Sequence, residues 1–586
     1  MFTHTKIICT IGPATRSKEM LVKLINAGMN VARVNFSHGS HEEHKQTINN
    51  IKEARKLCNK PIAIMLDTKG PEIRIGNLKN DQLQLVPKQR LKLVNRPSSS
   101  LDEIEINPFD ALEDARPSQK ILFDDGYIIG KIIEREKDFI IIEIQNEGVL
   151  KSRKRVNIPN IKVNLPAVTK EDIEDLKFGC INNIDLVAAS FIRSADHVLE
   201  IKKILEKEGK SEIFVIAKIE NSEGVENFDE IVDAADGIMV ARGDLGVEVD
   251  LSLVPKLQKM MVSKCYEACK PVVIATQMLE SMIINPRPTR AEVSDVANAI
   301  YESASCVMLS AETASGKYPI ETVEQMKKII FEAESDFDYK SFFYKESHVE
   351  YEDVSSSVAV ASVKTSYSSN AKAIFAITKT GFTARLLTRL RPKIPIIVLT
   401  KSEKKYNQLA FFWGVIPIFS SKWETEKEAF DILKQYAMEN DIISFGDFII
   451  LISSFPFEKR GITNLMLVES IGEILVRGFK GIGKKIKGKV AKIISVNGDT
   501  SAKAKDKIIV ISKCDERYLE AIKSAKGIIL QNSFKDTFSE TFLLQAAERL
   551  GIPIIVRAKY AFDILDDDEE IVLDPDKALI YIPEKN

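Results

Sequence analysis

The sequence has almost no net charge, and this limits the ligands that it can attract. Its 586 residues include 82 Lys or Arg and 84 Asp or Glu, which leaves a formal net charge of -2 at pH 7. Non-specific binding of nucleic acid needs a clear excess of basic residues. We therefore exclude attraction by a global field and expect any charged ligand to be held by a local group of side chains.

Cysteines with the spacing of a metal site or a redox motif are also lacking. The seven cysteines form an odd, scattered set without a Cys-x-x-Cys pattern, although Cys265 and Cys269 lie four residues apart on one helical face. Packing explains that pair better than metal binding or redox chemistry. We expect reduced thiols.

A leader segment and a membrane span are absent too. The first residues are not a basic stretch followed by an apolar one, and no apolar run approaches the ~20 residues that a membrane helix needs. We expect a soluble, cytoplasmic protein. Its length is several times that of one domain, so three or four separate cores are expected.

Eight short apolar runs, rich in β-branched residues, are present with helix-length stretches between most of them. They span residues 6–12, 31–37, 63–68, 185–191, 214–220, 237–243, 271–276 and 306–313. Strands that alternate with helices form parallel sheets, and eight such units close into a barrel. We predict an α/β protein whose catalytic domain, residues 1–69 and 167–340, is a (β/α)8 barrel.

The gap between the third and fourth runs is far too long for one crossover helix. Residues 70–166 carry alternating segments, such as 82–86 and 139–144, separated by Gly, Pro and Asn. This pattern predicts an inserted, β-rich lid domain.

Two further α/β domains are expected after the barrel. Residues 341–476 return to the strand–helix rhythm, with apolar runs at 373–378, 395–400 and 447–452. A lysine-rich, glycine-punctuated stretch, which we interpret as a solvated linker, then leads into a last domain at residues 477–586.

Polar side chains follow six of the eight apolar runs at the point where each strand ends. In a (β/α)8 barrel these strand ends converge at one face, where reactive groups lie. The residues at these six ends, polar except for Ala241 and Gly243, are Arg33, Asn35, Ser37 and His38; Asp67 and Thr68; Lys218 and Glu220; Ala241, Arg242, Gly243 and Asp244; Thr276; and Ser310 and Glu312. Their coincidence predicts one active site.

The residue types at these strand ends point to phosphoryl transfer. Glu220 and Asp244 offer hard oxygen ligands from adjacent strands, as Mg²⁺ requires, although salt bridges at a strand end are the plain alternative. Lys218 faces the same side of its strand as Glu220 and is placed to neutralise a phosphoryl group. The backbone N–H groups around Gly243 suit a substrate carboxylate.

A second set of oxygens suits a monovalent ion. Asn35, Ser37, Asp67 and Thr68 supply neutral oxygens and a single anionic group, which fits K⁺ better than a second small divalent ion. Ligand type is the sole basis of this expectation.

The order and spacing of several motifs resemble the pyruvate kinase family from about Lys6 to Ser470. The motifs are Cys-Thr-Ile-Gly-Pro-Ala at 9–14, Val-Asn-Phe-Ser-His-Gly at 34–39, Asp-Thr-Lys-Gly-Pro-Glu-Ile-Arg at 67–74, Lys-Ile-Glu-Asn at 218–221, Ala-Arg-Gly-Asp-Leu-Gly at 241–246, Ala-Thr-Gln-Met-Leu-Glu-Ser-Met at 275–282 and Pro-Arg-Pro-Thr-Arg-Ala-Glu-Val-Ser-Asp-Val-Ala-Asn-Ala at 286–299.

The resemblance implies transfer of the phosphoryl group of phosphoenolpyruvate to ADP, which gives pyruvate and ATP. It implies a homotetramer that needs Mg²⁺ or Mn²⁺, together with K⁺, whose use in this family goes with Glu72. The implied roles are Glu220 and Asp244 for Mg²⁺; Asn35, Ser37, Asp67 and Thr68 for K⁺; Arg33 and Lys218 beside the phosphoryl group; Ala241 to Asp244 with Thr276 for the carboxylate; Thr276, Ser310 and Glu312 for protonation; and Asn35, His38, Arg74 and Lys154 for ADP under the lid.

Three departures from the family pattern are present. Arg155 stands where Gly is usual in Lys-Gly-Val-Asn, residues 302–305 read Glu-Ser-Ala-Ser instead of Asp-Gly-Ala-Asp, and Ala311 replaces a glycine. We expect them to change the lid contact and proton delivery rather than the reaction.

The segment Thr378-Lys379-Thr380-Gly381-Phe382-Thr383 follows a predicted strand and precedes a predicted helix. Such a loop forms either a phosphate-binding nest or a tight turn with a helix N-cap. The resemblance implies a phosphorylated effector here, a sugar phosphate or a nucleotide.

The last domain resembles the swivelling phosphohistidine domain of some bacterial relatives. The carrier histidine of those domains falls about nine residues before a Gly-Ile-Pro, and Phe542 occupies that position here. The six histidines, His4, His38, His41, His44, His197 and His348, all precede the domain. A phosphocarrier role is therefore excluded, and a structural or regulatory role is expected.

Two other functions compete with the enzyme. A catalytically impaired paralogue that senses metabolites is opposed by the intact Lys218, Glu220 and Asp244. A dikinase-type phosphoryl relay is opposed by Phe542 and by the lack of an ATP-grasp domain.

Overall fold

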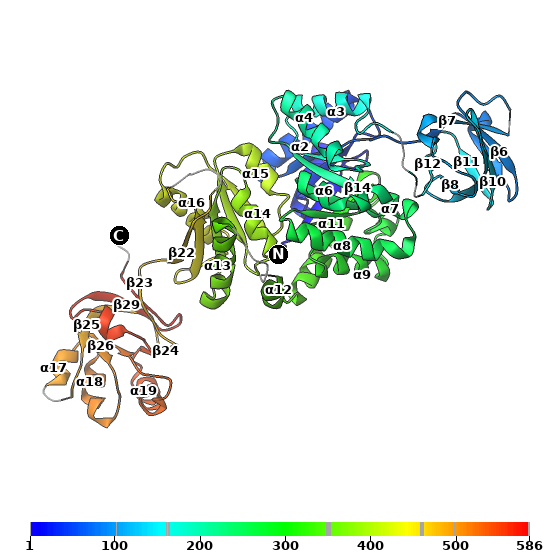
Figure 1. Ribbon diagram of the computed structural model, residues 1–586. Coiled ribbons are helices and arrows are strands. Elements are labelled where there is room, and N and C mark those ends of the chain that lie inside the picture. Colours follow the sequence, from blue (N-terminus) through cyan, green and yellow to red (C-terminus); the bar gives the residue numbers. More distant parts are fainter. Residues whose placement is uncertain are drawn as a thin grey trace. The chain divides into compact units, whose positions relative to one another are not determined.

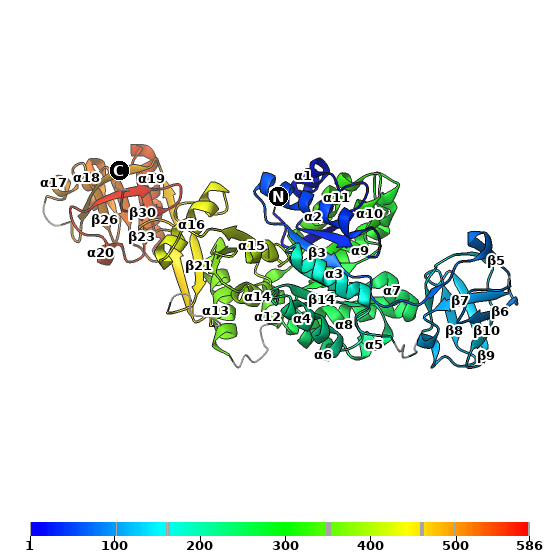
Figure 2. The same cartoon turned by 90° about the horizontal axis from the view of Figure 1, so that it is seen from above.

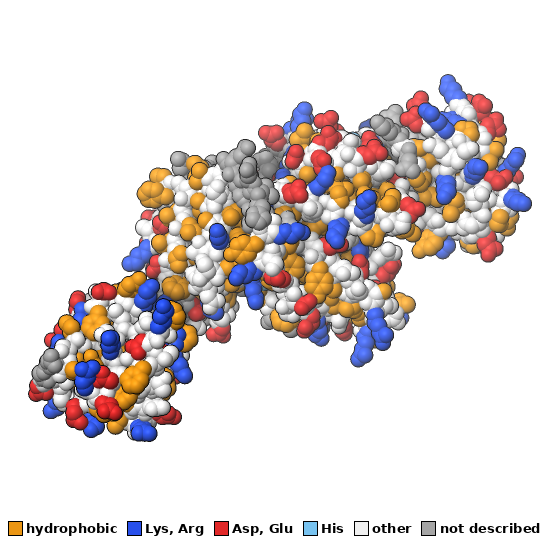
Figure 3. All heavy atoms as spheres, turned by 60° about the horizontal axis from the view of Figure 1, so that its bottom comes forward, with side chains coloured by type: hydrophobic (Ala, Val, Ile, Leu, Met, Phe, Trp, Pro, Cys, Tyr) orange, Lys and Arg blue, Asp and Glu red, His pale blue; other side chains and the backbone are white. Residues whose placement is uncertain are grey.

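The computed structural model describes residues 2–100, 102–159, 161, 165–346, 353–456, 462–496 and 499–583. His348 and a small part of the predicted lid lie outside these residues. The chain divides into two compact units: residues 1–363, 376–429 and 452–465, and residues 364–375, 430–451 and 466–586. No helix of the described chain is long and apolar enough to cross a membrane. Basic and acidic side chains are interspersed on the face in Figure 3, as the balanced charge suggests.

The eight predicted strands form a closed parallel barrel, which confirms the predicted fold (Figure 1). The strands are β1 (Lys6–Thr10), β2 (Val31–Asn35), β3 (Ala63–Asp67), β13 (Leu186–Ala189), β14 (Phe214–Ile219), β15 (Gly237–Ala241), β16 (Val272–Ala275) and β17 (Cys306–Leu309). Their order is β1-β17-β16-β15-β14-β13-β3-β2. Each strand ends before its predicted run does, which leaves the polar strand-end residues at or beyond the barrel rim.

Helices accompany the barrel strands. They are α1 (Lys18–Ala27), α2 (His41–Cys58), α3 (Lys170–Ile181), α4 (Ala195–Lys207), α5 (Ser222–Glu226), α6 (Phe228–Ala234), α7 (Arg242–Glu248), α8 (Val254–Glu267), α9 (Arg290–Tyr301), α10 (Ala311–Ala314), α11 (Pro319–Asp336) and α12 (Tyr339–Glu346). Capping boxes at Ser40, Thr169 and Thr289 fix where α2, α3 and α9 begin, since each side chain satisfies a free backbone N–H group.

A buried apolar layer fills the interior of the barrel. It comprises Ile8, Val31, Ala63, Met65, Leu186, Ala188, Ile216, Met239, Val273, Ala275, Cys306, Met308 and Phe411. Alternate residues along a strand point in opposite directions, so Ile7 and Cys9 belong to a second layer with the helices. Phe411 is fully buried, and its carbonyl accepts a hydrogen bond from Cys306 Sγ at 3.3 Å. A residue from beyond the barrel strands therefore completes the inner layer.

The insert between β3 and α3 is β-rich, as predicted. Its strands are β4 (Arg74–Ile75), β5 (Gln82–Leu85), β6 (Arg90–Val94), β7 (Glu103–Asn107), β8 (Lys120–Phe123), β9 (Ile128–Arg135), β10 (Phe139–Ile144), β11 (Gly148–Lys151) and β12 (Val156–Asn157). Seven form a sheet in the order β12-β8-β9-β10-β6-β7-β4, and β11 pairs with β5. We call this insert the lid.

The chain then returns to strands alternating with helices, which confirms the α/β prediction. The elements are α13 (Val354–Ser369), β18 (Ala373–Ile377), α14 (Phe382–Arg389), β19 (Ile396–Thr400), α15 (Glu403–Leu409), β20 (Val415–Phe419), α16 (Glu426–Glu439), β21 (Phe448–Ser453) and β22 (Leu465–Ser470). β19 and β20 pair in parallel, with Ile396 opposite Val415.

The last domain is built on an eight-stranded mixed sheet, seen from above in Figure 2. Its strands are β23 (Ile474–Arg477), β24 (Lys480–Ile482), β25 (Ile486–Lys492), β26 (Ile508–Ile511), β27 (Gly527–Leu530), β28 (Ile554–Val556), β29 (Glu570–Asp574) and β30 (Leu579–Tyr581), with helices α17 (Thr500–Ala504), α18 (Leu519–Ser524), α19 (Thr537–Leu550) and α20 (Ala561–Ile564).

The lysine-rich stretch that we interpreted as a linker was assigned wrongly, because it forms β24 and β25. Along β25 the residues Ile486 and Val490 are shielded, whereas Lys487 is exposed and pairs with Glu570 at 3.0 Å. A period of two buries one face of a strand and leaves lysines on the other. The number of lysines hid this alternation.

Candidate active site

The barrel brings the predicted side chains to one rim, at the carboxyl ends of its strands. Asn35 and Asp67 are paired directly across β2 and β3, and Lys218 lies near the end of β14. Asp244 is in the first turn of α7, directly after β15. Short strands followed at once by loops or helices place these groups at the rim.

Asp67 is the centre of a buried ionic network. It is 1% exposed, and its Oδ2 accepts a hydrogen bond from Arg33 Nε at 2.6 Å. Its Oδ1 accepts one from Lys218 Nζ at 3.1 Å. Burial opposes ionisation, but Arg33 and Lys218 outweigh it and hold the pKa of Asp67 below its usual value. The carboxylate therefore stays charged and fixes two cations.

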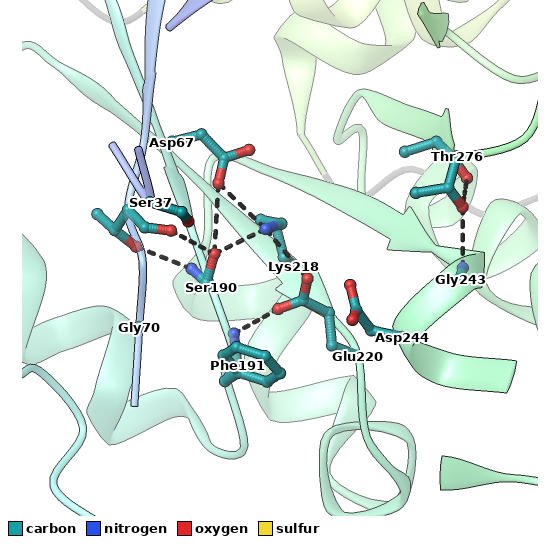
Figure 4. A network of polar contacts seen from close by, with 12 residues as sticks. Ser37, Asp67, Gly70, Ser190, Phe191, Lys218, Glu220, Gly243, Asp244 and Thr276 are labelled. Carbon is teal, nitrogen blue, oxygen red and sulfur yellow. Dashed lines mark hydrogen bonds and ion pairs between the residues drawn. The ribbon is translucent and has the colours of Figure 1, made fainter. Parts of the chain in front are cut away.

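Lys218 has three polar partners (Figure 4). Besides Asp67, its Nζ lies 3.0 Å from Glu220 Oε1 and donates to Ser190 Oγ at 2.6 Å. Although burial favours the neutral amine, the carboxylates of Asp67 and Glu220 raise the pKa of Lys218. The ammonium is charged, buried and held from three sides.

Glu220 and Asp244 extend this network toward the lid. Glu220 is 1% exposed, and its Oε2 accepts the backbone N–H of Phe191 at 2.6 Å. Burial raises the pKa of Glu220 to about 7; Lys218 works against this shift and Asp244 adds to it. In Figure 4 the two carboxylates lie beside each other. They form a pair of hard oxygen donors.

The oxygens predicted to bind K⁺ also come together near this network. Asn35 Oδ1 accepts the backbone N–H of Ser37 at 3.2 Å, which closes a tight turn after β2. Thr68 Oγ accepts the backbone N–H of Ser190 at 3.1 Å, and its carbonyl accepts from Ser190 Oγ at 2.6 Å. With Asp67, these groups give a set of mainly neutral oxygens.

Thr276, Gly243 and Arg242 contact one another at the ends of β15 and β16. The hydroxyl of Thr276 accepts the backbone N–H of Gly243 at 2.8 Å and donates to the carbonyl of Ala275 at 2.6 Å. Arg242 Nη1 donates to Asp295 at 2.8 Å and its Nη2 to the carbonyl of Thr276 at 2.8 Å. The Arg242 guanidinium thus stabilises the loop after β16. The backbone N–H of Gly243, which was expected to bind a substrate carboxylate, donates to Thr276.

Ser310 and Glu312 lie together after β17. Glu312 is 2% exposed, and its Oε2 accepts the backbone N–H of Ser310 at 2.7 Å. Its Oε1 accepts the N–H of Leu279 at 3.3 Å, which ties this turn to the loop after β16. Burial raises the pKa of Glu312.

The predicted nucleotide residues lie in different local surroundings. His38 is exposed, Arg74 Nε donates to Glu72 at 2.6 Å, and Lys154 pairs with Asp124 of the lid at 2.6 Å. A cleft adjoins Glu72, Arg155 and Glu220. Arg74 and Lys154 are thus held by carboxylates of the lid in this structure.

Arg155 makes a contact that the sequence did not predict. Its Nη1 donates closely to Asp244 Oδ1, and its Nε lies 3.4 Å from Glu72 Oε1. A lid residue thus reaches one of the two carboxylates expected to bind the metal. The only sequence signal was an unusual side chain at a position where the family has glycine.

Ser190 is the second residue that the sequence reasoning missed. Its hydroxyl joins Lys218, Asp67 and Thr68, at 2.6, 3.3 and 2.6 Å. It stands at the carboxyl end of the fourth strand, so the signal that found the other strand ends was present there.

The loop of Thr378 to Thr383 forms a tight turn that leads into α14. Thr378 Oγ accepts the backbone N–H of Gly381 at 3.0 Å, and Gly381 has a φ of 86°, which favours glycine. The hydroxyls of Thr383 and Thr463 are 2.9 Å apart. Lys379 and Thr380 are exposed.

Ser303, one of the departures from the family pattern, occupies an unfavourable site. Its φ is 72°, a conformation that suits glycine, and its buried Oγ has no hydrogen-bond partner among the described residues. Serine in place of the usual glycine therefore lowers the stability of the fold at this position.

Comparison with known proteins shows the family to which the chain is similar. The family model described as "Pyruvate kinase, barrel domain" matches residues 2–323, and that described as "Pyruvate kinase, alpha/beta domain" matches residues 356–469. A pyruvate kinase of Staphylococcus epidermidis is 40% identical over 581 residues, which cover 98% of each chain. One of Geobacillus stearothermophilus is 40% identical over 587 residues, 99% of each chain. One of Sporosarcina psychrophila is 39% identical over 583 residues, 98% of each chain.

Proposed function

This chain belongs to the pyruvate kinase family, and from that premise we propose which of its residues transfer the phosphoryl group of phosphoenolpyruvate to ADP. The observation that carries the proposal is the buried Lys218 ammonium, held by Asp67, Glu220 and Ser190 at the barrel rim. A preorganised cation in a dry site stabilises the charge of a migrating phosphoryl group far more than water does.

Glu220 and Asp244 are the proposed ligands of Mg²⁺ or Mn²⁺. Among the described residues no group of three or more His, Cys, Asp or Glu is arranged to hold a metal. Two carboxylates fit Mg²⁺, which is usually bound by one or two carboxylates together with substrate oxygens. When bound, the ion supplies charge neutralisation at those oxygens.

Lys218 and Arg33 are the proposed contacts of the phosphoryl group. Asp67 holds both through separate oxygens, and Arg33 Nη1 also donates to Thr10 Oγ at 2.9 Å. Because both side chains are braced, little rearrangement is needed to present two positive charges to the substrate.

Asn35, Ser37, Asp67 and Thr68 are the proposed K⁺ ligands, and Glu72 accompanies K⁺ use. The support is the cluster of mainly neutral oxygens at the ends of β2 and β3. K⁺ beside Asp67 would add positive charge close to the transferred group without further desolvation of a side chain.

The substrate carboxylate is proposed to bind at Ala241 to Asp244. Thr276 contacts Gly243 and lies on the same rim, which supports a role for its hydroxyl in protonating the enolate carbon. Glu312 holds the adjacent turn through the backbone N–H groups of Ser310 and Leu279, which supports a role in positioning this part of the site.

ADP is proposed to bind under the lid near Asn35, His38, Arg74 and Lys154. Closure of the lid would then exclude water from the site and prevent hydrolysis. Arg74 and Lys154 must exchange their carboxylate partners for phosphate oxygens, which a charged ligand offers at little net cost.

Regulation by a phosphorylated effector is proposed for the loop of Thr378, Lys379, Thr380, Gly381 and Thr383. A turn at a helix start, with the exposed Lys379 and Thr380, supports it. We also propose a cytoplasmic homotetramer, in which the domain at 477–586 is a swivelling-type module without its histidine and serves a structural or regulatory purpose.

A lactate dehydrogenase-coupled assay of the full chain tests the reaction. We expect pyruvate formation from phosphoenolpyruvate and ADP that needs Mg²⁺ or Mn²⁺ and rises with K⁺. Velocity against phosphoenolpyruvate, with and without K⁺, AMP and a panel of sugar phosphates, tests cation choice and regulation together. No turnover with both ions present would favour a metabolite sensor over an enzyme.

A further inference from the structure

Arg155 stands at the start of the lid's last strand and reaches three carboxylates. Its Nη1 contacts Asp244 Oδ1, while its Nε lies 3.4 Å from Glu72 Oε1 and 3.9 Å from Asp125 Oδ1. Of the three acids, Asp125 and Glu72 belong to the lid and Asp244 to the barrel. One guanidinium therefore connects the lid to the barrel rim.

The surroundings keep this guanidinium charged and close to its partners. The side chains of Arg155 and Asp244 are 29% and 27% exposed, and that of Glu72 is 8% exposed. Burial opposes the charge on Arg155, but Asp244, Glu72 and Asp125 outweigh burial and raise the pKa of the guanidinium. Arg155 thus carries its positive charge at every pH at which the protein is folded.

A divalent ion and this guanidinium compete for the same carboxylate. The contact uses Oδ1 of Asp244, and a divalent ion bound to that group would place positive charges within a few ångströms of each other. In a partly buried site such repulsion is several-fold stronger than in water. Binding of the ion and the Arg155–Asp244 contact therefore oppose each other.

We propose that Arg155 is an internal competitor of the divalent ion. Arg155 contacts Asp244 when the site holds no metal and leaves Asp244 when the metal binds. This inference rests on the proposed role of Asp244 as a metal ligand. It adds a link between the lid and the metal: binding of the ion removes one of the contacts that hold the lid to the rim.

A second contact between lid and barrel provides the matched control. Asn157, two residues further along, donates from Nδ2 to Glu248 Oε1 at 2.6 Å. It joins the same two parts of the chain but involves neither Glu220 nor Asp244. If lid attachment in general controls the metal site, the loss of Asn157 should act like the loss of Arg155.

Binding of Mn²⁺ to the full chain without substrates tests the proposal directly. Free Mn²⁺ is followed by electron paramagnetic resonance in the parent and in Arg155→Met, Arg155→Lys, Asn157→Ala and Asp244→Asn. Met keeps the apolar stem and removes the charge. We expect Arg155→Met to bind Mn²⁺ about fivefold more tightly, the upper end of the scale of one partly exposed charge pair. Arg155→Lys should show a smaller gain, and Asn157→Ala should stay within about twofold of the parent.

Amide hydrogen exchange provides a second test, which measures the attachment of the lid rather than the affinity for Mn²⁺. In the parent, Mn²⁺ should speed exchange of the N–H of Val156, which donates to the carbonyl of Ile73 at 2.8 Å. In Arg155→Met the exchange at Val156 should already be fast, and Mn²⁺ should not change it. Circular dichroism of each variant confirms that the fold is kept.

The outcomes separate this inference from the proposed function. Unchanged Mn²⁺ affinity in Arg155→Met, with binding lost in Asp244→Asn, overturns the competitor and leaves the metal site intact. An equal gain in Mn²⁺ affinity in Arg155→Met and Asn157→Ala also overturns the competitor role of Arg155, because loss of lid attachment alone would explain the result. Mn²⁺ binding that persists unchanged in Asp244→Asn overturns the metal site itself, and the competitor with it.

Discussion

Replacing Lys218 by Met removes the one ammonium that lies between Asp67 and Glu220. The nitrogen is 3.1 Å from Asp67 Oδ1 and 3.0 Å from Glu220 Oε1, and the lysine side chain is 10% exposed. Met has a similar length and no charge, so the change deletes electrostatics and keeps most of the packing. It therefore tests both the proposed catalysis and the stability of the site.

The two carboxylates respond differently to this loss. Asp67 retains Arg33 at 2.6 Å, whereas the favourable contact left to Glu220 among the described residues is the backbone N–H of Phe191. Breaking one side of a buried ion pair costs about 3–5 kcal/mol. Because Asp67 keeps Arg33 and Glu220 can take up a proton when Lys218 is lost, we expect the free energy of unfolding to fall by about 3 kcal/mol, the lower end of that range.

Activity should fall by more than this stability loss explains. Removing one preorganised group that stabilises transition-state charge costs about 10²–10³-fold in kcat. We expect kcat of Lys218→Met to fall by about 10³-fold in the coupled assay, measured at a temperature where circular dichroism shows the folded state. Lys218→Arg should recover part of the activity.

The double variant Lys218→Met with Glu220→Gln separates the two effects. The Glu220→Gln change replaces the uncompensated carboxylate by a neutral amide, so the double variant should regain most of the lost stability, as measured by urea unfolding. Its activity should stay low, because the ammonium and a proposed metal ligand are both absent. Activity within about tenfold of the parent in Lys218→Met would refute the reasoning, since the loss of a preorganised charge costs more than that.

Three further predictions concern parts of the barrel away from Lys218. Ser303→Gly should raise the free energy of unfolding in urea by about 1 kcal/mol, since glycine suits the φ of 72° and removes an unpartnered hydroxyl; no gain would contradict this. Glu334→Gln should lower the free energy of unfolding by about 2 kcal/mol, because Glu334 accepts hydrogen bonds from the backbone N–H and from Nδ1 of His4 at 2.8 and 3.1 Å. Burial opposes ionisation of Glu334, but the His4 contacts lower its pKa from 4.5. The stability that the charged Glu334 provides is therefore full above pH 4.5 and is lost as the pH falls further. In thermal unfolding experiments, the difference between the parent and Glu334→Gln should shrink at low pH. Of the seven free cysteines, Cys58 and Cys269 are partly exposed, so two thiols should react quickly with Ellman's reagent and five only on unfolding.

The barrel was predictable because its strands carry two independent signals. Apolar, β-branched runs mark the strands, and the polar residues directly after them mark the rim. The position of Lys218 two residues before Glu220 already placed both side chains on one face, and the structure joins them at 3.0 Å. Topology alone brings Asp67 and Asn35 together, since they are paired across neighbouring strands.

The pairing of charges within the site was not predictable in the same way. Sequence spacing cannot say which carboxylate Arg155 reaches, because that depends on how the lid meets the barrel. Lys154 was expected to face ADP but pairs with Asp124, since a lysine without a ligand takes the nearest carboxylate. The strands at residues 480–482 and 486–492 were hidden for another reason: lysines on the outer face of a strand resemble a solvated linker.

The burial of Phe411 in the inner layer of the barrel ties the folding of the catalytic domain to the order of synthesis. The last barrel strand ends at Leu309, but the ring that closes the interior is translated much later. Until it has left the ribosome, the inner layer lacks one of its large side chains, and unfilled apolar space weakens a fold in proportion to its volume. The boundary that separates the domains in sequence is therefore not the point at which the growing barrel reaches its full stability.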